Sequence, residues 1–349
     1  MLVCDSGDSK LDTAVNGWLK HDKNRETRQE VLDDIKQSKW EKLKKTMLHR
    51  QKFGTAGLRG RMGAGYMCMN DVVVLQTAQG LCSYVKKVCN QKQLQNGVVV
   101  GFDGRYNSKR FAELTTKVFI SSSIPVHLFA TVCPTPLVSF ATILYGAAAG
   151  VMVTASHNPK EDNGYKVYWG NGSQVITPHD DNILDEVWSC LHIPDEHWNI
   201  QAIRTHDLVK DCTEEVTTKY MEYIKSLLHE EILENNRKAQ INMVYSAMHG
   251  VGYECIVNAF QAANLKRHGV GKRQLGGSPL AVVSGGGHYD DRVVVVGTRP
   301  GGVVSAGTGT VQRRQGGGGR MSICHLGGQP SQVRLAVTRE RPSLGDQRP

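Results

Sequence analysis

Hydrophobic residues recur at helical spacing among charged residues from Leu11 to about Met47, which predicts a helical N-terminal segment. A glycine-rich turn follows at residues 53–60. Asn70 then occupies a good N-cap position before an apolar run that we expect to be helical through Val85. The pattern therefore predicts helices before the first clear strand.

From residue 98 onward, short apolar runs alternate with helical patterns. The expected strands are residues 98–102, 125–129 and 150–154. Ser108 is expected to cap the first helix, and Thr135 to cap the second, with Pro136 at its first helical position. A capping-box-like Thr177-Pro178-His179-Asp180 is expected to open the third. Gly146 is expected to end the second of these helices. Strands and helices that alternate across short connections predict a layered α/β domain with a parallel sheet.

The pattern beyond this domain is less regular. A polar stretch at 195–213 is typical of a linker, a helix is expected near 215–233, and residues 241–245 begin a second α/β unit that continues into a helix through Ile256 and Phe260. The predicted organisation is a helical extension (1–48), an α/β domain (49–194), the linker (195–213), an incomplete second α/β domain (214–264) and a tail (265–349).

Composition is typical of a folded globular protein, because hydrophobic residues make up 40% and charged residues 21% of the chain. Residues 1–10 hold no apolar signal-peptide core, and the longest nearly uncharged apolar run, 144–155, is too short to cross a bilayer. We therefore expect a cytoplasmic protein without a membrane partner. Nine dispersed cysteines without a C-x-x-C pair favour buried free thiols.

The net charge of +9 lies in the tail. Residues 1–264 contain 29 basic and 29 acidic residues, whereas residues 265–349 contain 13 basic and 4 acidic residues and 19 of the 37 glycines. This composition predicts a disordered tail, and we hypothesise that the chain has left its natural reading frame there. Weak nucleic-acid binding by Arg313-Arg314 and Arg320 is an alternative, but the scarcity of aromatic residues in the tail argues against it.

Candidate chemistry is concentrated after the third expected strand. Residues 150–154 lead into Ser156, His157 and Asn158, at the end of a strand where ligands bind in open α/β sheets. Lys160, Lys166 and His157 surround the serine hydroxyl with positive or proton-carrying groups, which suits a serine that carries a phosphoryl group. A solvated loop with an incidental serine remains an alternative, and a serine hydrolase is disfavoured because the G-x-S-x-G elbow is absent here.

Four segments resemble the α-D-phosphohexomutases, a family of phosphosugar mutases. They are Thr154-Ala155-Ser156-His157-Asn158-Pro159 with Asn163-Gly164-Tyr165-Lys166, then Phe53 to Gly60, Pro134-Thr135-Pro136, and His249-Gly250-Val251-Gly252. The resemblance covers about residues 11–264 and is nearest to the phosphoglucomutase-2 branch, which includes phosphopentomutase and glucose-1,6-bisphosphate synthase. It implies a layered α/β/α first domain in a truncated chain.

The resemblance also implies a role for each matching residue. Ser156 would be phosphorylated and would exchange its phosphoryl group with sugar phosphates through a sugar bisphosphate, with glucose 1,6-bisphosphate as activator. Lys166 would act as a general acid/base or as an electrostatic partner, and His157 would contact the substrate or orient Ser156. The expected phosphate and substrate contacts are Arg59, Thr55, Gly57 and Asn158.

The resemblance further implies Mg²⁺, held by the phosphate on Ser156 and by a D-x-D-x-D-R loop. This sequence has no such alternation of aspartates, and the family's sugar-recognition and distal phosphate-binding loops are missing. We therefore predict a phosphoglucomutase- or phosphopentomutase-type enzyme by family whose present chain is inactive. The alternative is a non-catalytic fragment that binds phosphosugars. Hexose or pentose preference, and mutase or bisphosphate-synthase activity, stay open.

Overall fold

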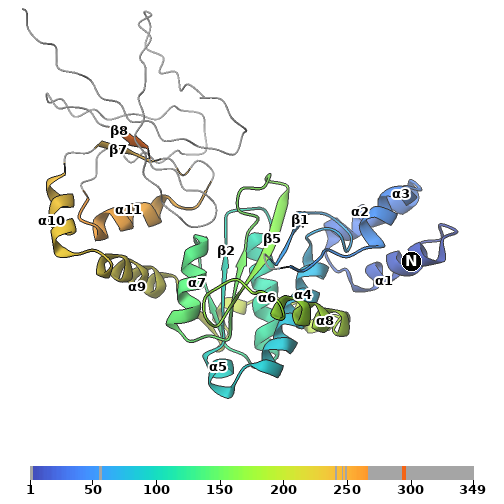
Figure 1. Ribbon diagram of the computed structural model, residues 1–349. Helices are drawn as coiled ribbons and strands as arrows, with labels where there is room; N and C mark the ends of the chain where they lie inside the picture. Colours follow the sequence, from blue (N-terminus) through green and yellow to red (C-terminus); the bar gives the residue numbers. More distant parts are fainter. Residues whose placement is uncertain are drawn as a thin grey trace, which may run out of the picture. The chain divides into compact units, whose positions relative to one another are not determined.

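The computed structural model describes residues 3–54, 57–239, 242–245, 247 and 250–265, together with the backbone of 293–295 (Figure 1). The chain divides into two compact units, Met1–Tyr220 and Met221–Pro349. The predicted disordered tail lies outside the described residues except for 293–295.

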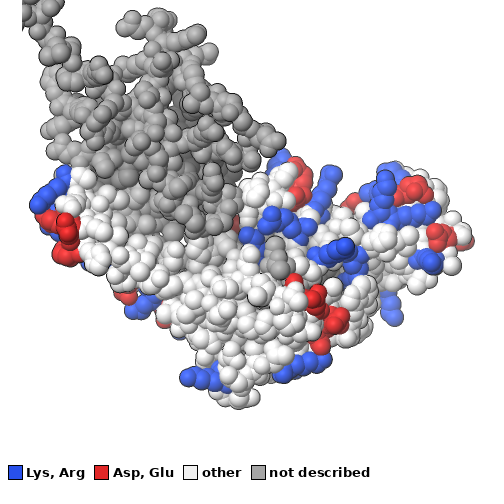
Figure 2. All heavy atoms as spheres, in the orientation of Figure 1, with Lys and Arg blue, Asp and Glu red and all other residues white. Residues whose placement is uncertain are grey.

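The first unit opens with helices α1 (Ser9–His21), α2 (Arg25–Lys36) and α3 (Trp40–Met47), which confirms the predicted helical start. The Asp8 carboxylate caps α1 by accepting from the backbone N–H groups of Lys10 and Leu11. The apolar stripe of these helices, which includes Trp18, belongs to the same buried cluster as the α/β domain. Figure 2 shows basic and acidic side chains interspersed over these helices.

One six-stranded sheet organises the unit in the order β1-β5-β4-β2-β3-β6. Its strands are β1 (Leu58–Arg61), β2 (Val98–Phe102), β3 (Val126–Leu128), β4 (Ala149–Val153), β5 (Asp162–Trp169) and β6 (Val209–Asp211). Strands β4, β2, β3 and β6 are parallel, as the alternating pattern predicts, whereas β5 runs antiparallel to both β4 and β1. The sequence pattern predicts neither β1 nor β5.

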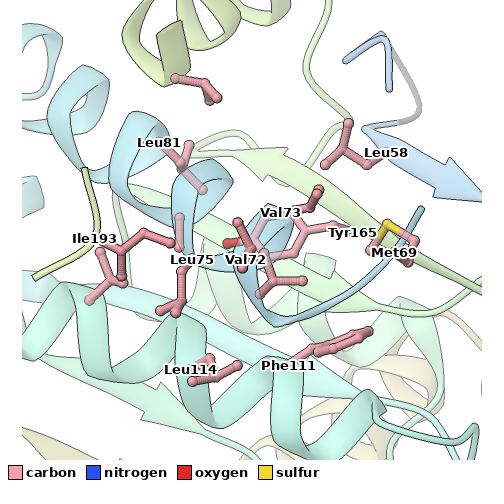
Figure 3. Packing of buried hydrophobic residues seen from close by; sticks show 14 of the residues in the cluster. Leu58, Met69, Val72, Val73, Leu75, Leu81, Phe111, Leu114, Tyr165 and Ile193 are labelled. Carbon is pink, nitrogen blue, oxygen red and sulfur yellow. The ribbon is translucent and has the colours of Figure 1, made fainter. Parts of the chain in front are cut away.

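Helices cover both faces of the sheet, so the layered α/β/α fold is confirmed. The helices are α4 (Asp71–Val88), α5 (Gln91–Asn96), α6 (Ser108–Ser121), α7 (Thr135–Leu144) and α8 (His179–Ser189). Within β2, Val98 and Val100 belong to the cluster that contains α4 and α6, while Val99 belongs to the cluster that contains α7. Figure 3 shows Leu75 and Leu81 of α4 and Leu114 of α6 among the packed side chains.

The predicted linker at 195–213 is wrong, because this segment completes the domain. It forms the 3₁₀ turns η1 (Asp195–Trp198) and η2 (Ile203–Thr205), and then β6, which pairs with β3. Ile203 is buried in the main cluster. A short edge strand with exposed side chains carries no hydrophobic alternation, and the sequence therefore resembles a polar connection.

Two predicted helix starts are displaced by a residue. Ser108 is the first residue of α6 rather than its cap, and its hydroxyl bonds Asp103 instead. Thr135 likewise begins α7 after Pro134, and no side chain caps α8 at Pro178. Gly146 follows the end of α7 with φ 59°, which confirms it as the stop signal.

The region after the sheet contains helix α9 (Thr213–Ser226), which joins the two units, and then α10 (Glu230–Lys238), β7 (Asn242–Val244) and α11 (Tyr253–Ala262). Two helices thus replace the single one expected near 215–233. Strand β8 (Val293–Val295) pairs in parallel with β7. His249, one of the residues of the family resemblance, lies outside the described residues.

No helix in the described part of the chain is both long enough and apolar enough to cross a membrane. The cysteines among the described residues are free, as the dispersed spacing predicts.

Candidate active site

Ser156 lies just past the carboxyl end of β4, on a turn at the edge of the sheet. Its φ of 55° is in the left-handed region, which a residue with a side chain adopts only when its surroundings hold it there. The backbone N–H of Ser156 donates to Thr154 Oγ1 at 2.9 Å, and the N–H of Asn158 donates to the carbonyl of Ala155 at 3.1 Å. Hydrogen bonds therefore hold the backbone of the turn, while the Ser156 side chain projects from it.

Lys166 contacts the serine hydroxyl directly. The antiparallel register of β4 and β5 places Lys166 opposite Met152, and its Nζ donates to Ser156 Oγ at 2.8 Å. The lysine is only 9% exposed. Burial lowers the pKa of Lys166, the positive charge of Arg59 lowers it further, and Asp103 acts in the opposite direction. A buried amine with a depressed pKa exchanges protons more readily than an exposed lysine.

Arg59 approaches the same turn from β1. Its register partner on β5 is Gly164, and its Nη1 donates to Asn158 Oδ1 at 3.3 Å. The side chain is exposed, so the remaining guanidinium donors face solvent beside the serine turn. Strands β1, β5 and β4 therefore bring Arg59, Lys166 and Ser156 together, although Arg59 and Lys166 are 107 positions apart in the chain.

Gly57 lies close to the backbone of β5. Its φ is 74°, and a Cβ added there would lie 1.9 Å from the carbonyl oxygen of Tyr165. A side chain at this position would therefore displace the strand that carries Lys166. Thr55, also predicted in this loop, lies outside the described residues.

His157 is exposed on the serine turn, and the structure places it in no bonded network with Ser156. Its predicted role in substrate contact or in orienting Ser156 stays a prediction. Asn158 is half-buried, and its Nδ2 donates to Asp162 Oδ2 at 2.8 Å while its Oδ1 faces Arg59.

Sequence reasoning missed a carboxylate behind the turn. Asp103, at the carboxyl end of β2, accepts from Thr154 Oγ1 at 2.6 Å and from Ser108 Oγ at 2.7 Å. Because Thr154 Oγ1 in turn accepts from the N–H of Ser156, Asp103 fixes the hydroxyl that holds the serine backbone. The available signal is that both β2 and β4 end in polar residues at the same edge of a parallel sheet.

Arg105 was missed as well. Its guanidinium donates to four backbone carbonyl oxygens of the serine loop, those of Ser156, Asn158, Pro159 and Asp162, at 2.7–3.0 Å. The Nε of Arg105 lies 3.3 Å from Asp103 Oδ2. The sequence gives only an Asp-Gly-Arg triplet after a strand.

The described residues do not fit the expected magnesium ion. They contain no group of three or more His, Cys, Asp and Glu side chains able to hold a metal. Beside Ser156 the charged neighbours are Lys166 and Arg59, and the carboxylate of Asp103 is already bonded to Thr154, Ser108 and Arg105. Mg²⁺ takes octahedral coordination by one or two carboxylates together with phosphate oxygens and water, and the described residues group no set of metal ligands beside Ser156.

The arrangement suits transfer of a phosphoryl group to or from a hydroxyl. The hydroxyl oxygen of Ser156 lies against the Lys166 amine, which can take the hydroxyl proton or return it. Arg59, beside the same turn, has exposed N–H donors for phosphate oxygens. Two hollows elsewhere, of about 370 and 480 Å³, are lined by Lys117 and His206 and by Asp211 and Lys219 respectively, and Ser156 lines neither.

Comparison with known proteins finds a matching family model and several relatives. Residues 50–190 match the family model described as phosphoglucomutase/phosphomannomutase, alpha/beta/alpha domain I. The human glucose 1,6-bisphosphate synthase is 39% identical over 267 residues, which are 75% of this chain and 42% of that protein. The human phosphopentomutase is 39% identical over 265 residues, 74% of this chain and 43% of that protein.

A yeast enzyme and a bacterial crystal structure are also similar to this chain. The phosphoribomutase of Saccharomyces cerevisiae is 38% identical over 260 residues, 72% of this chain and 41% of that protein. A crystal structure from Thermus thermophilus, described as a phosphomannomutase, has a TM-score of 0.50 at 23% identity, over 62% of this chain and 44% of that chain, which shows a shared fold. The chain thus spans about two fifths of the length of its curated relatives.

Proposed function

We propose, on the premise that residues 50–190 belong to the phosphoglucomutase/phosphomannomutase family, that Ser156 accepts a phosphoryl group from a sugar phosphate and returns it. The contact between Lys166 Nζ and Ser156 Oγ at 2.8 Å carries the proposal. It joins a nucleophile to a buried proton carrier at the edge of the sheet, beside an arginine with exposed donors.

In the forward step, Ser156 Oγ attacks the phosphorus of a sugar bisphosphate. The new bond joins Oγ to phosphorus, the bond between phosphorus and the sugar oxygen breaks, and the proton of the serine hydroxyl moves to that sugar oxygen, which becomes a hydroxyl. Lys166 lies where it can relay that proton. The reverse step transfers the phosphoryl group from Ser156 to a free hydroxyl of a sugar monophosphate and regenerates a bisphosphate. A complete cycle, in which Ser156 then takes back the phosphoryl group from the other position, would move phosphate within the sugar.

Arg59 stabilises the charge on the transferring group. Its guanidinium is exposed beside the turn, and phosphoryl transfer depends mainly on positioning and on compensation of charge at the equatorial oxygens. Gly57 and Asn158 support this role by fixing the loop and the arginine. His157 is proposed to contact the sugar, because it is exposed on the same turn.

The proposed substrates are hexose or pentose phosphates, with glucose 1,6-bisphosphate as phosphoryl donor. Three named relatives, a glucose 1,6-bisphosphate synthase, a phosphopentomutase and a phosphoribomutase, support this class. No metal-dependent step is assigned to this chain, because the described residues do not fit Mg²⁺.

The test is acceptance of phosphate by the full chain. After incubation with glucose 1,6-bisphosphate, intact mass spectrometry should show one added phosphoryl group, and Ser156→Ala should abolish it. Ser173→Ala is the matched control, because Ser173 is an exposed serine on the turn after β5. Equal labelling of the Ser156→Ala and Ser173→Ala variants would reject the proposal.

The prediction that this chain does not complete the mutase cycle needs a separate assay. We expect Ser156 to be labelled while glucose 1-phosphate is not converted to glucose 6-phosphate. Conversion at the rate of an ordinary phosphoglucomutase would contradict that prediction. Binding of a sugar phosphate without any labelling would favour the non-catalytic alternative.

A further inference from the structure

The backbone of Ser156 is held on both sides by one pair of side chains. Its N–H donates to Thr154 Oγ1, which itself donates to Asp103 Oδ2. Its carbonyl oxygen accepts from Arg105 Nη2 at 2.7 Å. Asp103 and Arg105 are joined to each other at 3.3 Å, so a single ion pair restrains the peptide groups that flank the serine.

Arg105 also closes the rest of the loop. Nη2 donates to the carbonyl of Asn158 at 2.8 Å, and Nη1 donates to those of Pro159 at 2.7 Å and Asp162 at 3.0 Å. The arginine side chain is 13% exposed, so these bonds form largely away from water. Carbonyls from residues 156 to 162 therefore converge on one guanidinium group.

The terminal nitrogens of Arg105 already donate to backbone carbonyl oxygens, and in this respect Arg105 differs from Arg59. A phosphate on Ser156 can be met by the exposed donors of Arg59, whereas both terminal nitrogens of Arg105 face backbone carbonyls. Arg105 can act on the reaction only through the loop. The left-handed φ of Ser156 requires such a restraint, because the turn would otherwise relax to a commoner conformation.

We propose that Arg105, held by Asp103, is the positioning residue that keeps Ser156 Oγ against Lys166. The effect of Arg105 on the reaction rests on the proposed function. Its role in holding the loop rests on the hydrogen bonds alone. Asp103 and Arg105 lie beside the serine loop because β2 pairs with β4, with Phe102 opposite Val153. The residues that follow each strand therefore meet at the same edge.

The test compares Arg105→Gln with Arg110→Gln in the full chain. Arg110 is the matched control, because it is bonded at 2.8 Å to Asp71, which is 2% exposed. Its loss should destabilise the fold without removing a bond to the serine loop. Trypsin cleavage after the exposed Lys160 reports loop opening. Arg105→Gln should raise that cleavage rate about tenfold above the Arg110→Gln rate, through local opening.

Phosphorylation of Ser156 by glucose 1,6-bisphosphate is the second measurement. Arg105→Gln should slow it by about 100-fold, since small misplacements of a reacting group cost rates of this order. Millimolar guanidinium should restore labelling of Arg105→Ala and should not improve Arg110→Ala, a rescue that general destabilisation does not produce.

Equal Lys160 cleavage in Arg105→Gln and Arg110→Gln would overturn the proposal, as would unchanged labelling in Arg105→Gln. If the wild-type chain is not labelled but only Arg105→Gln opens the loop, the phosphoryl-transfer function fails and the assignment of Arg105 as the loop's positioning residue is supported. The two failures are therefore distinguishable.

Discussion

At the scale of single residues, the proximity of Ser156 and Lys166 could be predicted from sequence, because both lie in one short segment with basic neighbours. Asp103 and Arg105 could not be predicted in the same way. Their importance comes from hydrogen bonds to atoms more than fifty positions away, and residue type alone does not reveal such distant partners. The arrangement of the site therefore depends on pairing of distant strands.

The lowered pKa of Lys166 predicts a pH dependence of Ser156 labelling. An amine with a depressed pKa becomes neutral at lower pH than the ordinary lysine value of 10.5, and only the neutral amine can accept the serine proton. The labelling rate should rise with pH through an apparent pKa below 10.5 and then level off.

Lys166→Met provides the check on this assignment. The variant should lose the rise and react about 100-fold more slowly, which is a typical contribution of general acid–base catalysis. Lys160→Met is the control, because Lys160 is exposed on the same loop. A pH profile shared by all three proteins would show that Lys166 does not move the proton.

At the scale of elements, the strands with internal apolar runs were predictable and the two strands that complete the site were not. Strands β2 and β4 are fully buried, and their sequences are continuous apolar runs. Strand β1 has the sequence LRGR, and β5 contains Asn163, Gly164 and Lys166, so neither has that pattern. Both strands form through pairing with each other across a long stretch of intervening chain.

Gly164 tests this pairing. A Cβ added there would lie 2.6 Å from the carbonyl oxygen of Thr154 and 2.9 Å from that of Leu58, which are backbone atoms on both sides of β5. Gly164→Ala should lower the free energy of unfolding by roughly 1–3 kcal/mol through overpacking. It should also slow Ser156 labelling, because Thr154 supports the serine turn.

Gly17→Ala is the matched control in urea denaturation. Gly17 lies inside α1, and its added Cβ would have one contact, the Tyr66 hydroxyl at 3.9 Å. This substitution should raise stability by about 0.5–1 kcal/mol, because glycine is costly inside a helix. Similar effects of the two substitutions would argue against the close approach at β5.

At the scale of the whole molecule, the layered fold was predictable from the sequence, but the boundaries between the domain and its flanking segments were less predictable. The predicted helical extension contributes Trp18 and its neighbours to the main core, and the predicted linker contributes a strand to the sheet. The error about the linker has a physical cause, since chain position and polarity do not show which distant surface a segment packs against. The chain beyond residue 265 carries no periodic pattern from which to predict structure.

Trp18→Ala tests whether the N-terminal helices are integral to the fold. The indole is 0% exposed, packs edge-on against Tyr66 at 5.1 Å and donates from Nε1 to Asp22 Oδ2 at 3.1 Å. The substitution should cost about 3–5 kcal/mol and lower the thermal midpoint of the whole first unit. Trp188→Ala, at a residue that is 54% exposed, should cost less. A separate early transition for Trp18→Ala, with the main transition unchanged, would show an independent extension.

The central claim is that the oxygen of Ser156 receives phosphate from a sugar bisphosphate. Fragment-ion mass spectrometry of the full chain, after incubation with glucose 1,6-bisphosphate, locates the added group on a single residue. We predict phosphoserine at position 156. A phosphoryl group found on any other residue, or a chain that stays unlabelled, would contradict the account.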